Sequence, residues 1–400
     1  MKVLVADSFE KAGLDGLAAL GCEVLYEPKL EGGALGARLA ETEAEVLVVR
    51  GTKVAASEID AASGLALIVR AGAGVNTIDL RAASARAIAV SNCPGKNAIA
   101  VAELAWGLIL ALARRLVEQA NDLRAGIWNK ALYGKARGLA GRTLGVIGLG
   151  AIGREVVERA KAFGMPIVAW SRSLDDDRAS RLGVARADSV HALAAASDVV
   201  TVHCALTKET QGMLDARFFE ALKPGSFFVN TSRGEVVDAV SLRKAVAERG
   251  VRAGLDVFEK EPAGGSGTFE DEIVKSPGVI GTHHVGASTE QAQNAIAAET
   301  VRIVAAFAST GDVPNAVNLA SRTPATHVLS VRHRDRIGVL AHVFGVLRAA
   351  GINVEQTENV VFAGAEAACA RIQVGAAPAA GVLEEIRACA DVLSVSVRAA

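Results

Sequence analysis

Short apolar runs alternate with Ala- and Leu-rich helical segments along most of the chain, and this rhythm restricts the fold more than any other feature. Four such runs fall within residues 1–97: KVLVA, EVLVV, LALIVRA and IAVSN. They lack the strict polar and apolar alternation of a half-solvated strand, which indicates parallel strands covered by helices on both faces. The rhythm restarts at RTLGVIGLGAIG and continues through PIVAW, DVVTVH, SFFVNTS, RAGLDVF and VIGTHHV. We therefore predict an α/β fold with two doubly wound parallel-sheet lobes, one nested within the other.

Two long helical segments and a distinct tail complete the predicted organisation. Residues 98–120 are expected to form one long buried helix, and residues 287–308 a second, with Ser288 or Thr289 near its N-cap. A connection containing proline and asparagine follows, with its linker at residues 319–327. Residues 328–400 then show the order βαββαβ, which is a complete small α+β unit.

The composition favours small-molecule partners. The formal net charge is −1 and the basic residues are dispersed, so the chain has no basic stripe for nucleic acid. The longest apolar segment, residues 98–113, carries Glu103 and is shorter than the roughly 20 residues that a bilayer crossing requires, so we expect no membrane partner. The five cysteines are scattered without C-x-x-C spacing, which predicts no metal site. Together with an N-terminus unlike a signal peptide, they favour a cytoplasmic protein.

A glycine-rich segment, GLGAIG at residues 148–153, follows the apolar run TLGVI and opens the helical stretch REVVERAKAF. In this context the first glycine makes the tight turn, the second lets a pyrophosphate approach the backbone, and the third lets helix and strand pack closely. The segment therefore predicts a dinucleotide cofactor in a Rossmann-type lobe. Its predicted cofactor contacts are Gly148, Gly150, Ala151, Ile152 and Gly153.

The end of the second strand in this lobe bears on the choice of cofactor. A NAD site usually places an acidic residue there, where it accepts hydrogen bonds from the ribose. This chain has Ser171 and Arg172 instead. An arginine at this position can pair with the 2′-phosphate of NADP. Alternatively, Arg172 is simply exposed, and the backbone and Ser171 hold NAD. NAD is the cofactor that we predict, and NADP stays open.

Arg233, Glu261 and His284 form the predicted catalytic group. Each follows one of three successive strand-like runs, and the carboxyl ends of parallel strands form the edge where α/β sheets bind ligands. An arginine can grip the carboxylate of a 2-hydroxy acid through two N–H groups. A histidine can take the hydroxyl proton as hydride leaves, and a carboxylate can orient the imidazole and stabilise its protonated form. The group therefore predicts hydride transfer from a 2-hydroxy acid.

Several motifs resemble those of a known family. GVIGLGAIG, NTSRGEVVD, GLDVFEKEP and HHVGAST are similar to the signatures of the D-isomer-specific 2-hydroxyacid dehydrogenases, and the similarity extends from residue 1 to about residue 318. Within that family, VVRGTKV, RAGAGVNTIDL and SNCPGKNAIAVAELAWGLILAL most resemble the D-3-phosphoglycerate dehydrogenases. Residues 328–400 resemble an ACT domain, an amino-acid-sensing module common in those enzymes.

The resemblance implies a division of the chain and a set of substrate contacts. The Rossmann-type cofactor lobe would be residues 98–286, nested in a flavodoxin-like substrate lobe made of residues 1–97 and 287–318. Residues 328–400 would form an ACT-type regulatory domain. The expected substrate contacts are Arg50, Ala73, Gly74 and Asn76, with Lys53 and Arg70 as secondary candidates for a phosphate group.

The resemblance also implies cofactor and subunit contacts. His203, Thr231 and Asp256 would lie beside the cofactor, with Asp256 on its nicotinamide side. Lys130, in the sequence WNK, would reach the site of a neighbouring subunit. We accordingly expect a homo-oligomer, either a dimer or a tetramer.

The effector site of the ACT family maps onto His333, Asp335 and Asn353. These side chains offer acceptors for an ammonium group and donors for a carboxylate, as an amino-acid effector such as L-serine requires. Ile337 stands before Gly338 where the family usually has proline, and Asp335 replaces an asparagine-like partner, so an altered or silent site is the alternative.

Three functions follow, in order of preference. The first is oxidation of 3-phosphoglycerate to 3-phosphohydroxypyruvate, the entry step of serine biosynthesis, with possible regulation by L-serine. The second is reduction of glyoxylate, hydroxypyruvate or another D-2-hydroxy acid product, which the sequence WSRS favours and the ACT-like tail disfavours. The third, of another class, is a non-enzymatic nucleotide-sensing co-regulator, which the neutral charge and the complete Arg233, Glu261 and His284 group disfavour.

Overall fold

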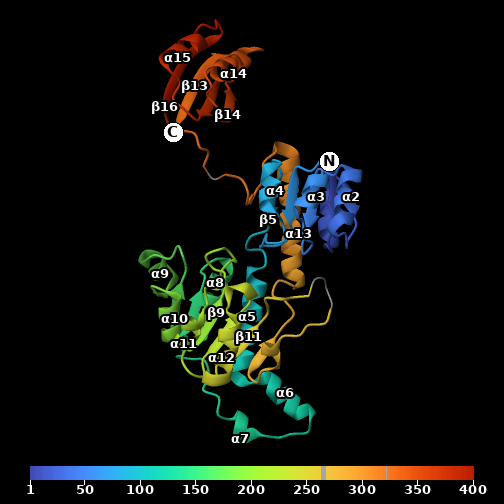
Figure 1. The fold of residues 1–400 in the computed structure, drawn as a ribbon, viewed down its shortest axis with the longest axis vertical. Helices are drawn as coiled ribbons and strands as arrows, with labels where there is room; N and C mark the ends of the chain where they lie inside the picture. Colours follow the sequence, from blue (N-terminus) through green and yellow to red (C-terminus); the bar gives the residue numbers. More distant parts are fainter. Residues whose placement is uncertain (263–266, 321) are drawn as a thin grey trace. The chain divides into compact units, whose positions relative to one another are not determined.

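The computed structural model describes residues 1–262, 267–320 and 322–400. The chain divides into two compact units, Met1–Asn318 and Leu319–Ala400 (Figure 1). The predicted linker at residues 319–327 includes Ser321, which lies outside the described residues. Within the described parts of the chain, none of the helices has the length and apolar character needed to cross a membrane.

A five-stranded parallel sheet forms the first lobe of the larger unit. Its strand order is β2-β1-β3-β4-β5, a doubly wound arrangement of the flavodoxin type. The apolar pattern did not reveal β2, because this edge strand exposes Glu23 and Tyr26. The strands are β1 (Lys2–Val5), β2 (Glu23–Tyr26), β3 (Val46–Val49), β4 (Leu67–Arg70) and β5 (Ala89–Asn92).

Helices cover both faces of this sheet because successive strand residues point to opposite sides. One core joins the strands to α2 (Gly32–Thr42), α3 (Ala56–Ala61) and α4 (Leu80–Ala85). The other joins them to α1 (Lys11–Ala19) and α13 (Glu290–Thr310). The predicted cap of α13 is confirmed, since the Thr289 hydroxyl accepts a hydrogen bond from Ala292 N at 3.2 Å. A helix late in the sequence thus completes the first lobe.

A seven-stranded parallel sheet forms the second lobe, with the order β12-β11-β10-β9-β6-β7-β8. The direction of winding reverses between β6 and β9, which is where Rossmann-type sheets bind dinucleotides. The strands are β6 (Leu144–Ile147), β7 (Ile167–Trp170), β8 (Ala185–Arg186), β9 (Val199–Val202), β10 (Phe227–Asn230), β11 (Arg252–Leu255) and β12 (Val279–Gly281). The prediction of two doubly wound parallel sheets is confirmed.

Two further cores flank the second sheet. One contains α5 (Ala98–Arg114), α8 (Ala151–Ala162) and α9 (Asp176–Leu182), and the other contains α10 (Val190–Ala196), α11 (Ala216–Ala221) and α12 (Ala239–Arg249). Short 3-10 turns lie at η1 (Gly234–Val236) and η2 (Glu272–Lys275).

The prediction of a single helix over residues 98–120 was wrong. Helix α5 ends at Arg114, because Arg115 adopts the left-handed conformation with φ of 51°. A separate helix, α6 (Leu116–Arg124), follows and has no buried residue. The short α7 (Lys130–Tyr133) comes next. The apolar periodicity that buries α5 stops at its end, so α6 has no apolar face to bury against the sheet.

The smaller unit has the predicted βαββαβ order and a four-stranded antiparallel sheet in the order β14-β15-β13-β16. Its elements are β13 (His327–Arg334), α14 (Val339–Ala349), β14 (Val354–Val361), β15 (Ala367–Val374), α15 (Ala380–Arg387) and β16 (Val392–Ala399). All residues of its hydrophobic core lie within this unit.

Candidate active site

A cavity of about 680 Å³ collects most of the predicted site residues in the larger unit. Its walls come from the carboxyl ends of strands in both sheets: β4 contributes Arg70, and β9, β10 and β11 lead to His203, Arg233 and Asp256. His284, which follows β12, also lines it. Ligands of open α/β sheets bind at this edge.

The glycine-rich segment forms the turn from β6 into α8. Gly148 has φ of 95°, and a Cβ on it would lie 2.7 Å from the carbonyl carbon of His203. A Cβ on Gly153 would overlap the carbonyl oxygen of Gly148, whereas one on Gly150 would meet nothing within 4 Å. The turn is therefore tight on its inner side and open at Gly150, which suits close approach of a pyrophosphate to the start of α8. Ala151 and Ile152 form the first turn, and Ile152 lines the cavity.

His203 and Thr231 lie next to each other in the wall of the cavity. The His203 ring contacts the Thr201 hydroxyl at 2.9 Å and the Thr231 hydroxyl at 3.4 Å. Burial lowers the pKa of His203 to about 3, so the ring is neutral at physiological pH. A neutral ring held by two hydroxyls is a rigid, uncharged surface for a bound ring system.

Asp256 is buried and holds the loop that carries His284. Its carboxylate accepts hydrogen bonds from the Thr282 hydroxyl at 2.5 Å, Val285 N at 3.0 Å and Gly286 N at 2.9 Å. Its backbone carbonyl accepts from His284 N at 2.8 Å. Asp256 thus fixes both sides of His284 as well as lining the cavity.

Ser171 and Arg172 follow β7 directly, at the predicted place for the adenosine ribose. The Arg172 side chain is exposed and has no ion pair within 4.0 Å among the residues that the structure describes. Its charge contributes to the lowered pKa of Glu209, after the hydrogen bonds from Thr207 and the backbone. Arg178 approaches from α9, with its guanidinium 3.0 Å from the Ser173 hydroxyl.

His284 and Glu261 form a close pair. The distance from His284 Nδ1 to Glu261 Oε2 is 2.6 Å, and Glu261 Oε1 accepts a hydrogen bond from Phe258 N at 2.9 Å. Burial alone would raise the pKa of Glu261, but the hydrogen bonds from His284 and Phe258 and the charge of Arg233 lower it overall. Glu261 is therefore an anion that fixes the imidazole, leaving Nε2 of His284 as its second functional atom.

Arg233 lies across the cavity beside the first lobe. Its Nη1 donates to the Ser232 carbonyl at 2.6 Å, and its Nη2 donates to Asn76 Oδ1 at 3.3 Å. A Cβ on Gly74 would lie 2.5 Å from Nη2, so a larger residue there would require the guanidinium to shift. Ala73 also lines the cavity, and its carbonyl accepts from Asn92 at 2.5 Å. The structure thus brings Arg233, Gly74 and Asn76 together.

Arg50 and Arg70 extend this positive region. Burial and the charges of Arg233 and Arg50 lower the pKa of Arg70 to about 10. Its buried Nε has no hydrogen-bond partner in the described part of the chain. Arg50 lies 3.5 Å from the Ser288 hydroxyl through its Nη2. Arg70 and Arg233 line the cavity, and Arg50, which does not line it, is near enough for its charge to act on Arg70.

The sequence analysis did not name Asp7 and gave Arg70 only as a secondary candidate. Asp7 lies two residues after β1, and its Oδ2 accepts from Arg50 N at 2.5 Å and from the next two amides at 3.0 Å. It thereby shapes the loop that carries Arg50. The available signal was the position of Asp7 just beyond one parallel strand and of Arg70 at the end of another. Lys53 is exposed, and Lys130 on α7 does not line the cavity.

The predicted effector residues have different surroundings in the smaller unit. The His333 ring is buried and lies between the Arg334 carbonyl, at 2.8 Å, and Asn359 Oδ1, at 3.1 Å. Asn353 lines a different, shallow cavity and donates to Glu355 at 2.8 Å. Asp335 is exposed. Asn353 thus lines a cavity, whereas His333 is held inside the unit by its own hydrogen bonds.

Known proteins with related sequences agree with this geometry. Residues 106–286 match the family described as D-isomer specific 2-hydroxyacid dehydrogenase, NAD binding domain. The D-3-phosphoglycerate dehydrogenase of Archaeoglobus fulgidus is 38% identical over 81% of this chain and 60% of its own length. The glyoxylate reductase of Thermococcus litoralis is 36% identical over 72% of this chain and 86% of its own length.

A solved structure shows the same fold. Cofactor(NAD+)-bound 3-phosphoglycerate dehydrogenase of Entamoeba histolytica superimposes with a TM-score of 0.67 at 26% identity, covering 80% of this chain and 99% of the other. The chain spans only about 60% of the length of the Archaeoglobus fulgidus relative. It covers most of the glyoxylate reductase.

Proposed function

The chain belongs to the D-isomer-specific 2-hydroxyacid dehydrogenases, and from this premise we propose that it oxidises 3-phosphoglycerate to 3-phosphohydroxypyruvate. NAD is the proposed cofactor, as in the family's NAD binding domain and in the Entamoeba histolytica relative. The substrate carries a carboxylate and a phosphate, so its site needs more positive charge than a simple 2-hydroxy acid requires.

The observation that carries the proposal is the group of three arginines. Arg233 supplies the guanidinium for the carboxylate, and Arg50 and Arg70 supply charge for the phosphate. Burial, and after it the charges of Arg233 and Arg50, lower the pKa of Arg70, so the charged form of Arg70 is disfavoured in the empty site. A substrate with two anionic groups counters those charges, and its oxygens can accept from the unpartnered Arg70 Nε.

In the proposed reaction the substrate loses a proton to His284 and a hydride to the cofactor. His284 Nε2 takes the proton of the C2 hydroxyl, and Glu261 stabilises the imidazolium through Nδ1. Arg233 orients the carboxylate and polarises the developing carbonyl. When bound, NAD supplies the acceptor for the hydride from C2. Gly148, Gly150, Ile152, His203, Thr231 and Asp256 would hold it, since they form the glycine turn and the adjoining cavity wall.

The direct test is the initial rate of nicotinamide reduction with 3-phosphoglycerate, using NAD and NADP in parallel. D-Glycerate, which lacks the phosphate, is the matched substrate. Arg50→Ala and Arg70→Ala should lower kcat/KM for 3-phosphoglycerate about tenfold or more and affect D-glycerate much less. Equal losses on both substrates, or no turnover of 3-phosphoglycerate by the unaltered protein, would refute the assignment.

A reductase of glyoxylate or hydroxypyruvate is the second candidate. The exposed Arg172 after β7 suits the 2′-phosphate of NADPH, and the Thermococcus litoralis glyoxylate reductase is covered over most of its length. Faster oxidation of NADPH by glyoxylate or hydroxypyruvate than reduction of NAD by 3-phosphoglycerate would favour this candidate. It would keep the roles of Arg233, Glu261 and His284.

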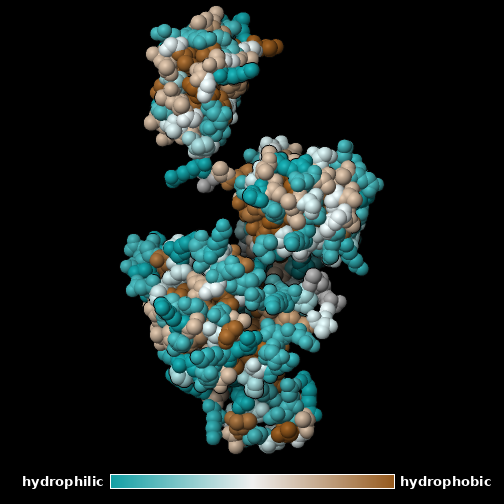
Figure 2. All heavy atoms as spheres, viewed as in Figure 1, coloured by the Kyte–Doolittle hydropathy of each residue, from teal (hydrophilic) through white to brown (hydrophobic). Residues whose placement is uncertain are grey.

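A homo-oligomer is also part of the proposal. The α6–α7 segment exposes Leu123, Ile127 and Trp128, by 59%, 51% and 79%, and Figure 2 shows separate hydrophobic spots among hydrophilic residues at this end of the larger unit. Large apolar side chains exposed within one short segment favour an interaction site, and a second copy would bring Lys130 to its neighbour's site. Light scattering should give at least a dimer, and Trp128→Glu with Ile127→Glu should shift it to a monomer.

L-Serine is the proposed effector of the smaller unit, with Asp335 and Asn353 as its contacts. Because His333 is already engaged with Asn359, a role for His333 requires a different arrangement of its ring. Inhibition by L-serine that Asn353→Ala removes would support an active effector site. A cytoplasmic location is proposed as well, supported by five cysteines that are all free thiols.

A further inference from the structure

A second cavity, of about 380 Å³, lies at the opposite edge of the seven-stranded sheet. Its lining residues Ser226, Phe227 and Arg252 lie at the amino ends of β10 and β11, and Asp198 directly precedes β9. Because these strands are parallel, this edge is separate from the one that carries Arg233 and His284. The cavity plays no part in the proposed reaction.

Positive charge dominates this second cavity. Seven basic side chains line it, and Asp198 is its one acidic lining residue. Asp198 pairs with Lys223 at 3.4 Å and with Arg137 at 3.8 Å. Glu118, just outside, pairs with Arg115 at 3.5 Å and Arg252 at 2.5 Å. Two carboxylates therefore face seven cations, and the excess positive charge attracts a small anion with more than one negative charge.

The floor of the cavity contains polar atoms with unused hydrogen-bonding capacity. Arg142 is only 7% exposed and Ser226 only 2% exposed, yet Arg142 Nε and Ser226 Oγ have no hydrogen-bond partner in the described part of the chain. Buried polar atoms without partners are unfavourable. Because both residues line the cavity, oxygens of a ligand bound there can accept hydrogen bonds from these two donors.

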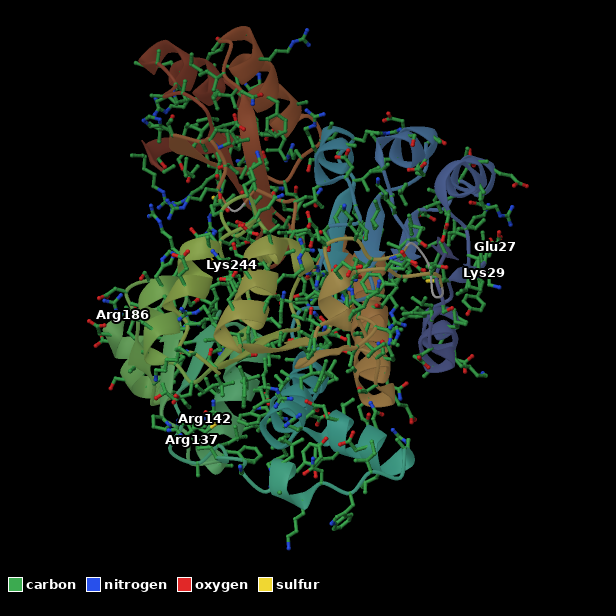
Figure 3. All side chains as sticks on the ribbon, turned by 60° about the horizontal axis from the view of Figure 1, so that its bottom comes forward. Glu27, Lys29, Arg137, Arg142, Arg186 and Lys244 are labelled. Carbon is green, nitrogen blue, oxygen red and sulfur yellow. The ribbon has the colours of Figure 1, made fainter. Side chains whose placement is uncertain are left out.

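The Arg142 guanidinium is held in place from two sides. Its Nη2 donates to the Asp198 carbonyl at 3.1 Å, and its plane lies over the Phe227 ring, 4.3 Å from the centroid. A guanidinium fixed in this way loses little conformational entropy on binding a planar or tetrahedral oxyanion. Arg137, 72% exposed, lies at the open side of the same cavity, and Figure 3 shows it close to Arg142.

We propose that this cavity binds the phosphate or diphosphate group of a small molecule, at a site distinct from the active site. Guanidinium groups bind phosphate oxygens through paired N–H donors, and the hydroxyl of Ser226 adds a neutral donor. The volume of about 380 Å³ is within the range of small-molecule sites. The inference is independent of the substrate and reaction proposed above.

Calorimetric titration of the full chain with inorganic pyrophosphate tests the proposal, with ionic strength held constant by sodium chloride. Arg137→Glu and Ser226→Ala should each weaken binding at this site at least tenfold. Lys244→Glu, on the exposed face of α12 and outside both cavities, makes the same charge change as Arg137→Glu and should alter affinity less than twofold. Arg233→Ala should leave this binding in place, which separates it from pyrophosphate at the active site.

Arg137→Glu and Ser226→Ala should both fold normally, so weaker binding by either variant would not result from unfolding. Arg137 is exposed, and Ser226→Ala removes an unsatisfied buried hydroxyl, so the melting temperatures of both should stay near that of the unaltered protein. Absence of saturable binding would overturn the proposal. Binding that Lys244→Glu weakens as much as Arg137→Glu, or that Ser226→Ala leaves unchanged, would do the same, because it would reflect general charge attraction.

Discussion

His284 shows how single residues are prepared for the proposed chemistry. It is a non-glycine residue with φ of 53°, a left-handed conformation that costs free energy unless its surroundings impose it. The carbonyl and carboxylate of Asp256 bind the backbone on both sides of it, and Glu261 binds its ring. This backbone strain aims the imidazole into the cavity that Arg233 also lines.

Substitutions of His284 and Glu261 should lower kcat by unequal amounts. His284→Ala removes the proposed base, so kcat should fall by about 10²–10⁴-fold. Glu261→Gln keeps the size of the side chain but removes the charge that stabilises the imidazolium, so kcat should fall by roughly tenfold or more, about 1.4 kcal/mol. Steady-state rates with the preferred substrate measure both. A Glu261→Gln loss larger than that of His284→Ala would contradict their roles.

Arg172 should influence cofactor choice and leave the chemistry unaffected. Arg172→Ala removes a charged donor for the 2′-phosphate, so KM for NADP should rise about tenfold, as expected for loss of one charge-assisted hydrogen bond. KM for NAD and both kcat values should change less than about twofold. Arg181→Ala, at an exposed arginine on the neighbouring helix α9, is the matched control. An equal rise of KM for both cofactors would show that Arg172 does not contact the 2′-phosphate.

At the scale of elements, two glycines of the turn between β6 and α8 should have different roles. Gly148 allows the turn to pack tightly, and Gly150 allows the cofactor to approach the backbone. Gly148→Ala places a methyl group against the His203 carbonyl at a φ of 95°, so it should destabilise the fold by about 1–3 kcal/mol and weaken NAD binding. Gly150→Ala meets no atom within 4 Å, so stability should hold while NAD binding weakens. Chemical denaturation and fluorescence titration measure the two effects. Unchanged NAD affinity in Gly150→Ala would argue against cofactor approach there.

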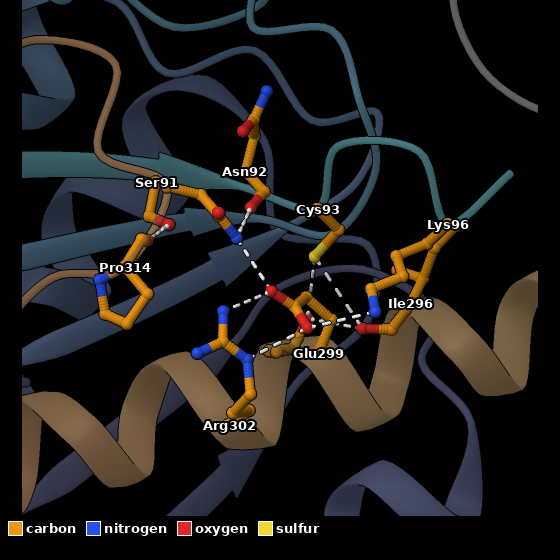
Figure 4. A network of polar contacts seen from close by, with 10 residues as sticks. Ser91, Asn92, Cys93, Lys96, Ile296, Glu299, Arg302 and Pro314 are labelled. Carbon is orange, nitrogen blue, oxygen red and sulfur yellow. Dashed lines mark hydrogen bonds and ion pairs between the residues drawn. The ribbon is translucent and has the colours of Figure 1, made fainter. Parts of the chain in front are cut away.

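The junction of β5, α13 and the segment after it depends on one carboxylate. Glu299 is buried and pairs with Arg302 at 2.6 Å and Lys96 at 3.3 Å, while Asn315 donates to it at 2.7 Å (Figure 4). Burial opposes its ionisation, but the hydrogen bond from Arg302, with those from Asn315 and Lys96, lowers its pKa to about 2. The ionised carboxylate thus holds together chain segments from three parts of the sequence.

Glu299→Gln should reveal this contribution through its pH dependence. A carboxylate whose folded-state pKa is depressed stabilises the fold above its unfolded pKa, and the contribution is lost as pH falls from about 4.5 toward about 2. The variant should lose about 1–3 kcal/mol of unfolding free energy at pH 7, and the difference should narrow below pH 4.5. Urea denaturation at pH 7 and pH 3 measures it, with the exposed Glu220→Gln on α11 as control. A difference independent of pH would assign the loss to packing.

Local pattern and strand order predicted much of this structure, whereas long-range contacts were beyond the sequence. The sequence predicted the strand before Gly148 from its apolar run. It also predicted that Arg233 and His284 lie at one edge of the sheet, because each follows a parallel strand. The sequence did not predict that Asp7 holds the backbone of Arg50. This contact joins the ends of β1 and β3, and their pairing in the sheet is known only from the fold. The end of α5 at Arg115 was missed because a left-handed residue leaves no apolar signature.

At the scale of the whole molecule, the two units carry separate hydrophobic cores. Four core clusters lie within Met1–Asn318, and the fifth lies within Leu319–Ala400. Each cluster draws on one unit alone, so neither unit needs the other to bury its apolar side chains. Every residue proposed for catalysis and for cofactor or substrate contact lies in the larger unit.

A chain ending at Asn318 should therefore fold and keep its dehydrogenase activity. We expect its kcat/KM to lie within about threefold of the value for the full chain, because the truncation cuts no core cluster. Its melting temperature should be close to that of the major unfolding transition of the full chain. Any inhibition by L-serine should disappear, since the proposed effector residues are removed, whereas pyrophosphate binding at the Arg142 cavity should remain. Loss of activity with an intact fold would instead mean that the smaller unit supports catalysis, for example by holding the subunits together.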